Sequence, residues 1–156
     1  MFTVETENPN QTEQLAGIIA SYLSKGSILA LDGDLGAGKT IFSKGLAKSL
    51  GVKEPVTSPT FVIMQQYEDG RIPLYHFDVY RIEDPDELYE TGAEEFFYGD
   101  GISVIELASL IEELLPEDMI RVRISRMPEK GPDRRKIDVD GFAPETERKI
   151  KEELDY

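Results

Sequence analysis

Residues 33–40 read GDLGAGKT. It matches the pattern G-x-x-x-x-G-K-[ST] at every fixed position. The apolar run SILALDG comes before it, and the segment after it carries Phe42, Leu46 and Leu50 on one helical face. A buried strand, a glycine loop and an amphipathic helix in that order predict a phosphate-binding loop, or P-loop, in an α/β domain.

The residue types of this loop suit a polyphosphate. Glycines let successive backbone N–H groups face the phosphates, and the N-terminus of the following helix adds a favourable partial charge. The pattern predicts that Lys39 reaches the β- and γ-phosphates and that the Thr40 hydroxyl binds Mg²⁺. A chance glycine turn before a helix is disfavoured, because strand, loop and helix are all present.

A P-loop also needs an acidic side chain to hold Mg²⁺ or to orient water, and two acids end apolar strands. Glu106 follows ISVI, the arrangement expected at the carboxyl edge of a parallel sheet, where ligands bind. Asp78 lies in YHFDVY, where period-2 alternation places it on one face with His76 and Tyr80. Both carboxylates are therefore candidates for the site.

Other interpretations of these side chains stay open. Either carboxylate could face water or pair with an arginine such as Arg81, and Asp32 and Asp34 compete for the same role. His76 is more often a strand histidine with a satisfied partner than a catalyst. The segment VTSPTF, residues 56–61, could be a loop that responds to the γ-phosphate, although an ordinary loop is the simpler interpretation.

Composition limits the function classes. The 156 residues include 17 Lys+Arg and 31 Asp+Glu, for a net charge of −14, and such a surface repels nucleic-acid backbones. With no cysteine and one histidine, thiolate and histidine-rich metal sites are excluded. The chain has neither a membrane-length apolar run nor the order of a signal peptide, so we expect a cytoplasmic protein. Its length predicts one domain over residues 1–156.

The remaining patterns predict a P-loop NTPase-like sheet, with a mixed parallel core and antiparallel strands, flanked by helices. The motif EDGR between two β-rich runs predicts a hairpin. The expected strands are 2–6, 27–33, 60–67, 72–80, 102–106, 119–125 and 135–141. The expected helices are about 11–25, the segment after the P-loop up to residue 50, one with Asp84 as N-cap, 107–116 and about 144–154.

Several motifs then occur in one order along the chain: LDGDLGAGKT, VTSPTF, LYHFDVYR and DPDELYETGAEEFF, followed by a strand-end VIE and by LLP. In this order they resemble the bacterial TsaE (YjeE) family over about residues 10–140. The P-loop is shared by many ATPases, whereas SPTF together with YHFDVYR is much more specific. The chain departs from the family at Leu107, where Trp is common after the glutamate.

The resemblance implies a small Mg²⁺-dependent ATPase that binds and slowly hydrolyses ATP. It further implies a requirement for N6-threonylcarbamoyladenosine at position 37 of tRNAs that read ANN codons. The implied partners are TsaD and TsaB, which carry out the transfer, so that tRNA is involved only indirectly. The lack of an N-K-x-D motif also favours ATP over GTP. Two alternatives stay open: a small-molecule or protein kinase with the same loop, and a nucleotide-binding module without turnover.

Carried over by position, the resemblance also implies the site residues. Asp78 matches an essential aspartate, Glu106 a metal-site glutamate, and residues 57–60 a nucleotide-responsive loop. The expected catalytic residues are Lys39, Asp78 and Glu106, and the expected Mg²⁺ ligands are Thr40 and Glu106. The residues expected to bind the nucleotide are Thr12, Gly33, Asp34, Leu35, Gly36, Ala37, Gly38, Lys39, Thr40, Ile41, Thr60 and Arg134.

Overall fold

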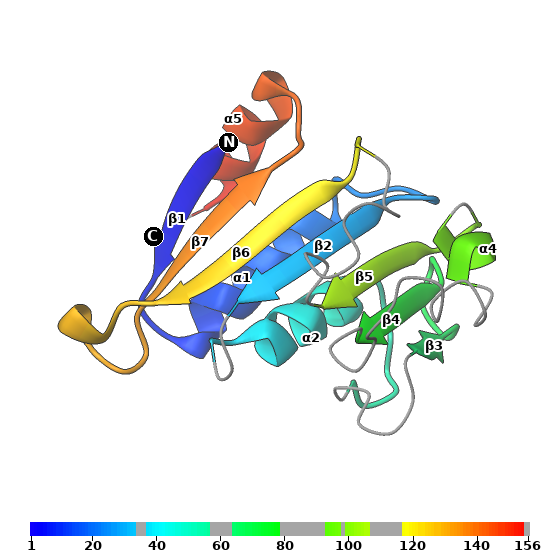
Figure 1. Cartoon of the computed structure of the whole chain (residues 1–156), viewed down its shortest axis with the longest axis horizontal. Coiled ribbons are helices and arrows are strands. Elements are labelled where there is room, and N and C mark those ends of the chain that lie inside the picture. The colour runs from blue at the N-terminus through cyan, green and yellow to red at the C-terminus, as the bar shows by residue number, and fades with distance from the viewer. Residues whose placement is uncertain (34–36, 57–63, 79–92, 98, 107–116, 155–156) are drawn as a thin grey trace.

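The structure is a computed structural model that describes residues 1–33, 37–56, 64–78, 93–97, 99–106 and 117–154. Within these residues one seven-stranded sheet has the order β1-β7-β6-β2-β5-β4-β3 (Figure 1). The strands are β1 Phe2–Thr6, β2 Ile28–Gly33, β3 Met64–Tyr67, β4 Leu74–Asp78, β5 Ile102–Glu106, β6 Ile120–Arg126 and β7 Arg135–Asp140. The expected helix after Asp84 and the expected helix 107–116 lie outside the described residues.

The centre of the sheet is parallel and its two sides are antiparallel. β6, β2, β5 and β4 run in one direction, while β7 and β1 on one side and β3 on the other complete antiparallel pairs. β2 and β5 are apolar runs because parallel strands are covered on both faces, whereas outer strands alternate. The parallel centre and the antiparallel sides confirm the predicted mixed sheet. In β6 buried and exposed residues alternate. This strand is antiparallel to β7 but parallel to β2, so it joins the parallel centre of the sheet to one antiparallel side.

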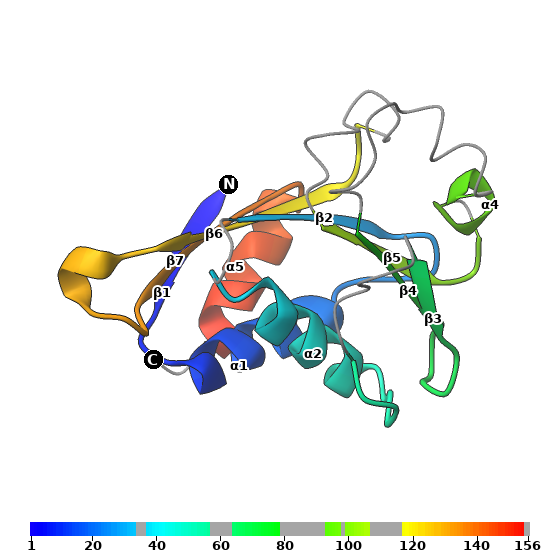
Figure 2. The same cartoon turned by 60° about the horizontal axis from the view of Figure 1, so that its bottom comes forward.

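Three helices lie on the same side of this sheet, as Figure 2 shows. They are α1 Pro9–Ala20, α2 Lys39–Ser49 and α5 Pro144–Glu153. The short α4 Ala93–Phe97 carries Phe97, whose ring packs on that of Phe77 in β4 at a centroid distance of 5.2 Å. A 3-10 turn, Pro128–Lys130, lies between β6 and β7. None of the helices described here has the length and apolarity that a membrane span requires.

Helix α1 begins and ends earlier than the apolar spacing predicts. Asn8 is its N-cap and accepts a hydrogen bond from the backbone N–H of Gln11 at 3.0 Å, and Pro9 occupies the first turn. The predicted end near residue 25 was wrong because Leu23 is buried even though it lies beyond the helix. The periodic apolar pattern therefore continues beyond Ala20, the last residue of the α-helix, into a turn in which the N–H of Leu23 donates to the carbonyl of Ala20.

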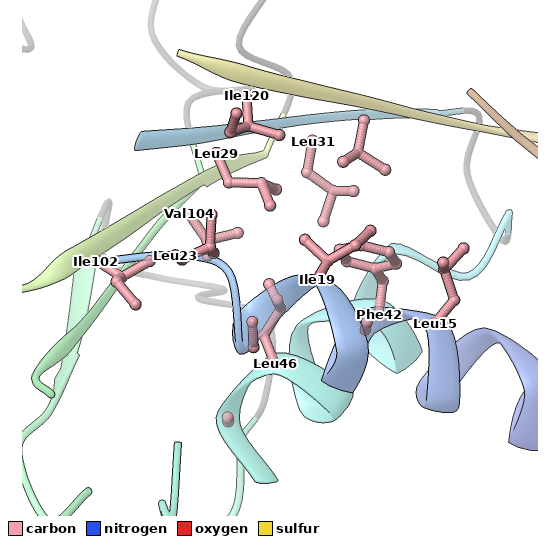
Figure 3. Close-up of a cluster of buried hydrophobic side chains, with 14 of the residues drawn as sticks. Leu15, Ile19, Leu23, Leu29, Leu31, Phe42, Leu46, Ile102, Val104 and Ile120 are labelled. Carbon is pink, nitrogen blue, oxygen red and sulfur yellow. The ribbon is translucent and has the colours of Figure 1, made fainter. Parts of the chain in front are cut away.

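A hydrophobic core fills the space between the sheet and α1 and α2 (Figure 3). Burying each large apolar side chain there contributes about 1.5–3 kcal/mol relative to exposure. Phe42, Leu46 and Leu50 all lie in this core, which confirms the predicted inner face of α2. The labelled side chains are Leu15, Ile19, Leu23, Leu29, Leu31, Phe42, Leu46, Ile102, Val104 and Ile120.

The two central helices cross in close contact at Gly45. A Cβ atom at this position would lie 2.6 Å from the carbonyl oxygen of Glu13 and 2.8 Å from the Cβ of Ala16. Both distances are shorter than van der Waals contact, so only glycine fits without moving the helices apart. The crossing therefore fixes α2, and with it the P-loop, against α1.

The hairpin predicted from EDGR is formed by β3 and β4, and its turn contacts the far end of α2. Asp69 in this turn accepts hydrogen bonds from the backbone N–H groups of Lys53 at 2.9 Å and Glu54 at 3.2 Å. The backbone N–H of Arg71 donates to the carbonyl of Leu50 at 2.8 Å. These bonds connect the hairpin to the end of α2, so both ends of α2 contact other parts of the fold.

Candidate nucleotide-binding site

The carboxyl ends of three parallel strands meet at the edge of the sheet from which the P-loop leaves. In the register of the sheet Leu31 lies opposite Glu106, and Glu106 lies opposite Asp78. The loop follows β2 at this edge, and α2 begins at Lys39. The carboxyl edge of an open parallel sheet is where ligands bind in α/β folds. The fold therefore brings the loop and both strand-end acids to one place.

The end of the loop has the backbone geometry of an anion site. Gly38 is the N-cap of α2 and has a φ of 112°, a left-handed conformation that side chains disfavour. Within the described part of the chain no side-chain hydrogen bond caps this end of the helix. The first backbone N–H groups of α2 point out of this end of the helix, where a bound anion is favoured.

Lys39 joins the two ends of the P-loop. Its Nζ donates to the carbonyl oxygen of Gly33 at 2.8 Å, across residues 34–36. A phosphate oxygen is a stronger acceptor than a carbonyl for an ammonium group, because both partners are then charged. The ammonium group therefore lies beside the start of the loop, and its contact with phosphate stays a prediction.

An arginine from β7 reaches the same loop, and sequence reasoning missed it. The Nε of Arg135 donates to the carbonyl oxygen of Ala37 at 2.7 Å, and its Nη1 donates to that of Pro132 at 2.6 Å. Arg134, which the family resemblance indicated, instead forms an ion pair with Glu7 at 2.9 Å. Alternation in β7 could have identified Arg135, because Ile137 two residues later faces the core under the helices.

Thr12 and Ile41 lie next to the loop, as expected of nucleotide-binding residues. They line a small pocket of about 20 Å³ together with Pro9, Ala37, Gly38, Asp133 and Arg135. Thr12 is buried, and its hydroxyl lies 2.8 Å from that of Thr6. The structure thus places Thr12 and Ile41 beside the loop, and their contact with nucleotide stays a prediction.

Glu106 is buried at the end of β5 and has a partner that the sequence did not predict. Its side chain is 5% exposed, and Oε1 lies 3.1 Å from Nε2 of His76, whose side chain is 1% exposed. The expected alternatives for this carboxylate were water or an arginine. A buried carboxylate is retained only with such a partner, because desolvation otherwise makes its charge costly. The pairing of β4 with β5 brings these side chains together.

The donor groups at this edge fit Mg²⁺ that is bound together with a nucleotide. In the described part of the chain no cluster of three or more His, Asp or Glu side chains could hold a metal on its own. Mg²⁺ in nucleotide sites uses one or two protein oxygens and takes the others from phosphate and water. The Glu106 carboxylate and the half-buried Thr40 hydroxyl are oxygen donors of this kind.

Two larger cavities lie away from the loop. One of about 390 Å³ is lined by residues 22–28 and 118–120 together with Phe142, and one of about 610 Å³ lies in the groove between α1 and α2. Neither is lined by the described residues of the loop or by Glu106. The predicted site residues Asp34, Leu35, Gly36 and Thr60, and the side chain of Asp78, lie outside the described residues.

Comparison with known proteins gives consistent matches. The family model "Threonylcarbamoyl adenosine biosynthesis protein TsaE" matches residues 6–137. The tRNA threonylcarbamoyladenosine biosynthesis protein TsaE of Bacillus subtilis (strain 168) is 47% identical over 132 residues, which cover 85% of this chain and 80% of that protein. The protein of the same name from Treponema pallidum (strain Nichols) is 39% identical over 119 residues, 76% of this chain and 87% of its own length. A crystal structure of YdiB from Bacillus subtilis matches with a TM-score of 0.76 at 39% identity, over 98% of this chain and 93% of that chain.

Proposed function

The chain belongs to the TsaE family, and on that premise we propose that it is a P-loop ATPase of threonylcarbamoyladenosine biosynthesis in tRNA. One observation carries the ATPase part of the proposal. The loop with Gly38 and Lys39 leaves the same sheet edge at which the buried carboxylate of Glu106 lies. Phosphate-binding groups and a metal-binding oxygen at one edge are the parts that nucleotide hydrolysis requires.

The proposed reaction is the attack of water on the γ-phosphorus of ATP, with release of ADP and inorganic phosphate. Lys39 and the N–H groups of the loop hold the phosphates, and Asp78 orients the attacking water. Thr40 and Glu106 are the proposed Mg²⁺ ligands, and bound Mg²⁺ offsets charge on the phosphate oxygens. Arg135 holds the loop through the carbonyl of Ala37.

The proposed partners are the TsaD and TsaB proteins, which would transfer the threonylcarbamoyl group to adenosine 37 of tRNAs that read ANN codons. ATP in this chain would act as a signal for their reaction. The net charge of −14 supports an indirect role toward tRNA, because a surface of this sign repels the phosphate backbone. Binding to the protein partners therefore accounts for the pathway better than binding to tRNA.

A pull-down with TsaD–TsaB tests the proposal when it is combined with an assay of phosphate release. We expect association that differs between ATP and ADP, and release of inorganic phosphate that Lys39→Ala abolishes. Association that is the same with ATP and with ADP would contradict the proposed role with these partners. Recovery of labelled phosphate on an added hydroxyl compound would instead identify a kinase.

A further inference from the structure

The pair formed by His76 and Glu106 does more than fill the interior of the sheet. Both side chains are almost completely buried, and one hydrogen bond of 3.1 Å joins Nε2 to Oε1. A carboxylate can only accept a hydrogen bond, so Nε2 must carry the proton. We therefore assign to His76 the tautomer that is protonated at Nε2. The bond is then charge-assisted and directional, and it restricts how the carboxylate can rotate.

The second ring nitrogen of His76 argues against a purely structural role. Nδ1 is buried and has no hydrogen-bond partner among the residues described. An unsatisfied buried nitrogen next to a buried carboxylate costs stability, and apolar side chains of similar volume would pack there without this cost. Stability alone therefore does not account for a histidine at this position.

The register of the sheet places His76 on the inner side of Glu106. His76 lies opposite Val104, one pleat before the edge, while the residue opposite Glu106 is Asp78. Leu74 and Val104 belong to the core, so His76 approaches the carboxylate from the core side. Oε1 is engaged on that side, and one carboxylate oxygen is left for a ligand at the edge.

We propose that His76 is a positioning residue, which holds Oε1 of Glu106 so that the other carboxylate oxygen binds Mg²⁺ at the P-loop. This rests on the proposed function, in which Glu106 is a metal ligand. Partners that orient metal ligands in this way typically change metal affinity by about 10- to 100-fold when they are removed. His76 would then act on the metal without touching nucleotide or Mg²⁺.

Two substitutions with side chains of similar size distinguish a positioning role of His76 from a packing role. In His76→Gln the side-chain amide nitrogen lies close to the position of Nε2 and can still donate to Glu106. In His76→Asn the amide is shorter, takes the place of Nδ1 and does not reach the carboxylate. We expect His76→Asn to weaken metal binding by about 10- to 100-fold and His76→Gln to stay within about threefold of the wild type.

The measurement uses the full chain with a non-hydrolysable ATP analogue and Mn²⁺ as the probe, and free Mn²⁺ is counted by electron paramagnetic resonance. Binding of the analogue in EDTA should be the same for both variants. The urea midpoint should be lower for His76→Asn, because the buried Glu106 carboxylate then loses its partner, so affinities are measured under conditions where circular dichroism shows both variants to be folded. Adding His76→Asn to Glu106→Gln should cause no further loss of Mn²⁺ affinity, because the two residues act through one ligand.

The outcomes distinguish this inference from the proposed function. Equal Mn²⁺ affinity in His76→Asn, His76→Gln and wild type, with a loss in Glu106→Gln, would overturn the positioning role and leave the metal role of Glu106 intact. Unchanged Mn²⁺ affinity in Glu106→Gln would remove the metal role itself, and the inference with it. Equal losses in both His76 variants would show that packing matters and not the donated hydrogen bond.

Discussion

Lys39 is the side chain that connects the two ends of the P-loop. It forms a hydrogen bond with the Gly33 carbonyl, and in the proposed function it exchanges this partner for phosphate oxygens. Lys39→Ala should lower ATP affinity by roughly 10- to 150-fold, the equivalent of one charge-assisted hydrogen bond of about 1.5–3 kcal/mol. Isothermal titration with ATP measures this. The exposed Lys44 on the same helix provides the control, and an equal loss in Lys44→Ala would point to net charge as the cause.

The neighbouring arginines Arg134 and Arg135 allow a comparison at the same scale. Arg135→Ala removes the donor to the Ala37 carbonyl, and we expect ATP affinity to fall by roughly tenfold, because the loop loses a charge-assisted hydrogen bond. Arg134→Ala breaks a surface ion pair with Glu7, which is worth at most about 1 kcal/mol, and should leave ATP affinity nearly unchanged. The reverse order would support the nucleotide contact that the family resemblance implies for Arg134.

Some residues of this site are predictable from the sequence and others are not, for a physical reason. The P-loop residues form one contiguous motif, so their relation to each other does not depend on the fold. The partner of Glu106 depends on the register between β4 and β5, which a sequence pattern does not determine. Choosing between Arg134 and Arg135 needs only the alternation of β7, and that signal was present in RKIDVD.

At the scale of elements, the crossing of α1 and α2 gives a prediction with a matched control. Gly45→Ala places a Cβ against Glu13 and Ala16, and overpacking of this kind costs about 1–3 kcal/mol. Gly17 lies in the same interface, but a Cβ there would be 3.8 Å from Ser49, an ordinary contact. Gly17→Ala should therefore be neutral or stabilising by about 0.5–1 kcal/mol. Urea unfolding measures both, and equal effects would contradict the close crossing.

The hairpin turn gives a prediction about pH. Hydrogen bonds from the N–H groups of Lys53 and Glu54 lower the pKa of Asp69. The pKa of Asp69 is lower in the folded chain than in the unfolded chain, where it is about 3.9. The stabilisation is therefore complete above the unfolded pKa and is lost as the pH falls through the folded pKa. Asp69→Asn should lower the free energy of unfolding at pH 7 and have a smaller effect near pH 3.

Glu68→Gln in the same turn is the control for the hairpin, since it removes one negative charge and leaves Asp69 in place. Urea titrations at the two pH values give the free energies. A difference between Asp69→Asn and wild type that is constant with pH would show that the carboxylate charge is not what holds the turn against α2.

Elements were predictable where local signals agree. Glycine in the turn and alternation on both sides are enough for the β3–β4 hairpin, and its antiparallel pairing follows. The bounds of α1 were less predictable, because the start signal at Asn8 and Pro9 is short and buried residues continue beyond the last turn. Tertiary burial overrides helical periodicity at that end.

At the scale of the whole molecule, α5 tests whether the chain is one cooperative unit. This helix lies beyond residues 6–137, yet Ile150 is completely buried in the core and Tyr22 of the segment after α1 donates to Glu153. Ile150→Ala should lower the free energy of unfolding by about 2–5 kcal/mol while keeping a single transition. Circular dichroism and tyrosine fluorescence in urea should coincide. Two transitions, or no change relative to Lys149→Ala, would contradict a single domain that includes α5.

The architecture was predictable as a class but not as a strand order. A strand, a P-loop and a helix predict a parallel centre with helices, and alternating strands near the end of the chain predict antiparallel additions. The position of β6 between β2 and β7 is decided by contacts between residues far apart in sequence. Such contacts leave no pattern within one segment.

The pairing of β1 with β7 also has a consequence for how the molecule is made. Thr3 and Asp138 form a hydrogen bond across these strands although they are 135 residues apart. A nascent chain on the ribosome exposes β1 early, but β7 emerges only when residues 135–139 have been translated. Until then β1 has no neighbouring strand, and we expect its short length and the charge of Glu5 to limit pairing with other chains. β1 can therefore take its place beside β7 only after β7 has been made.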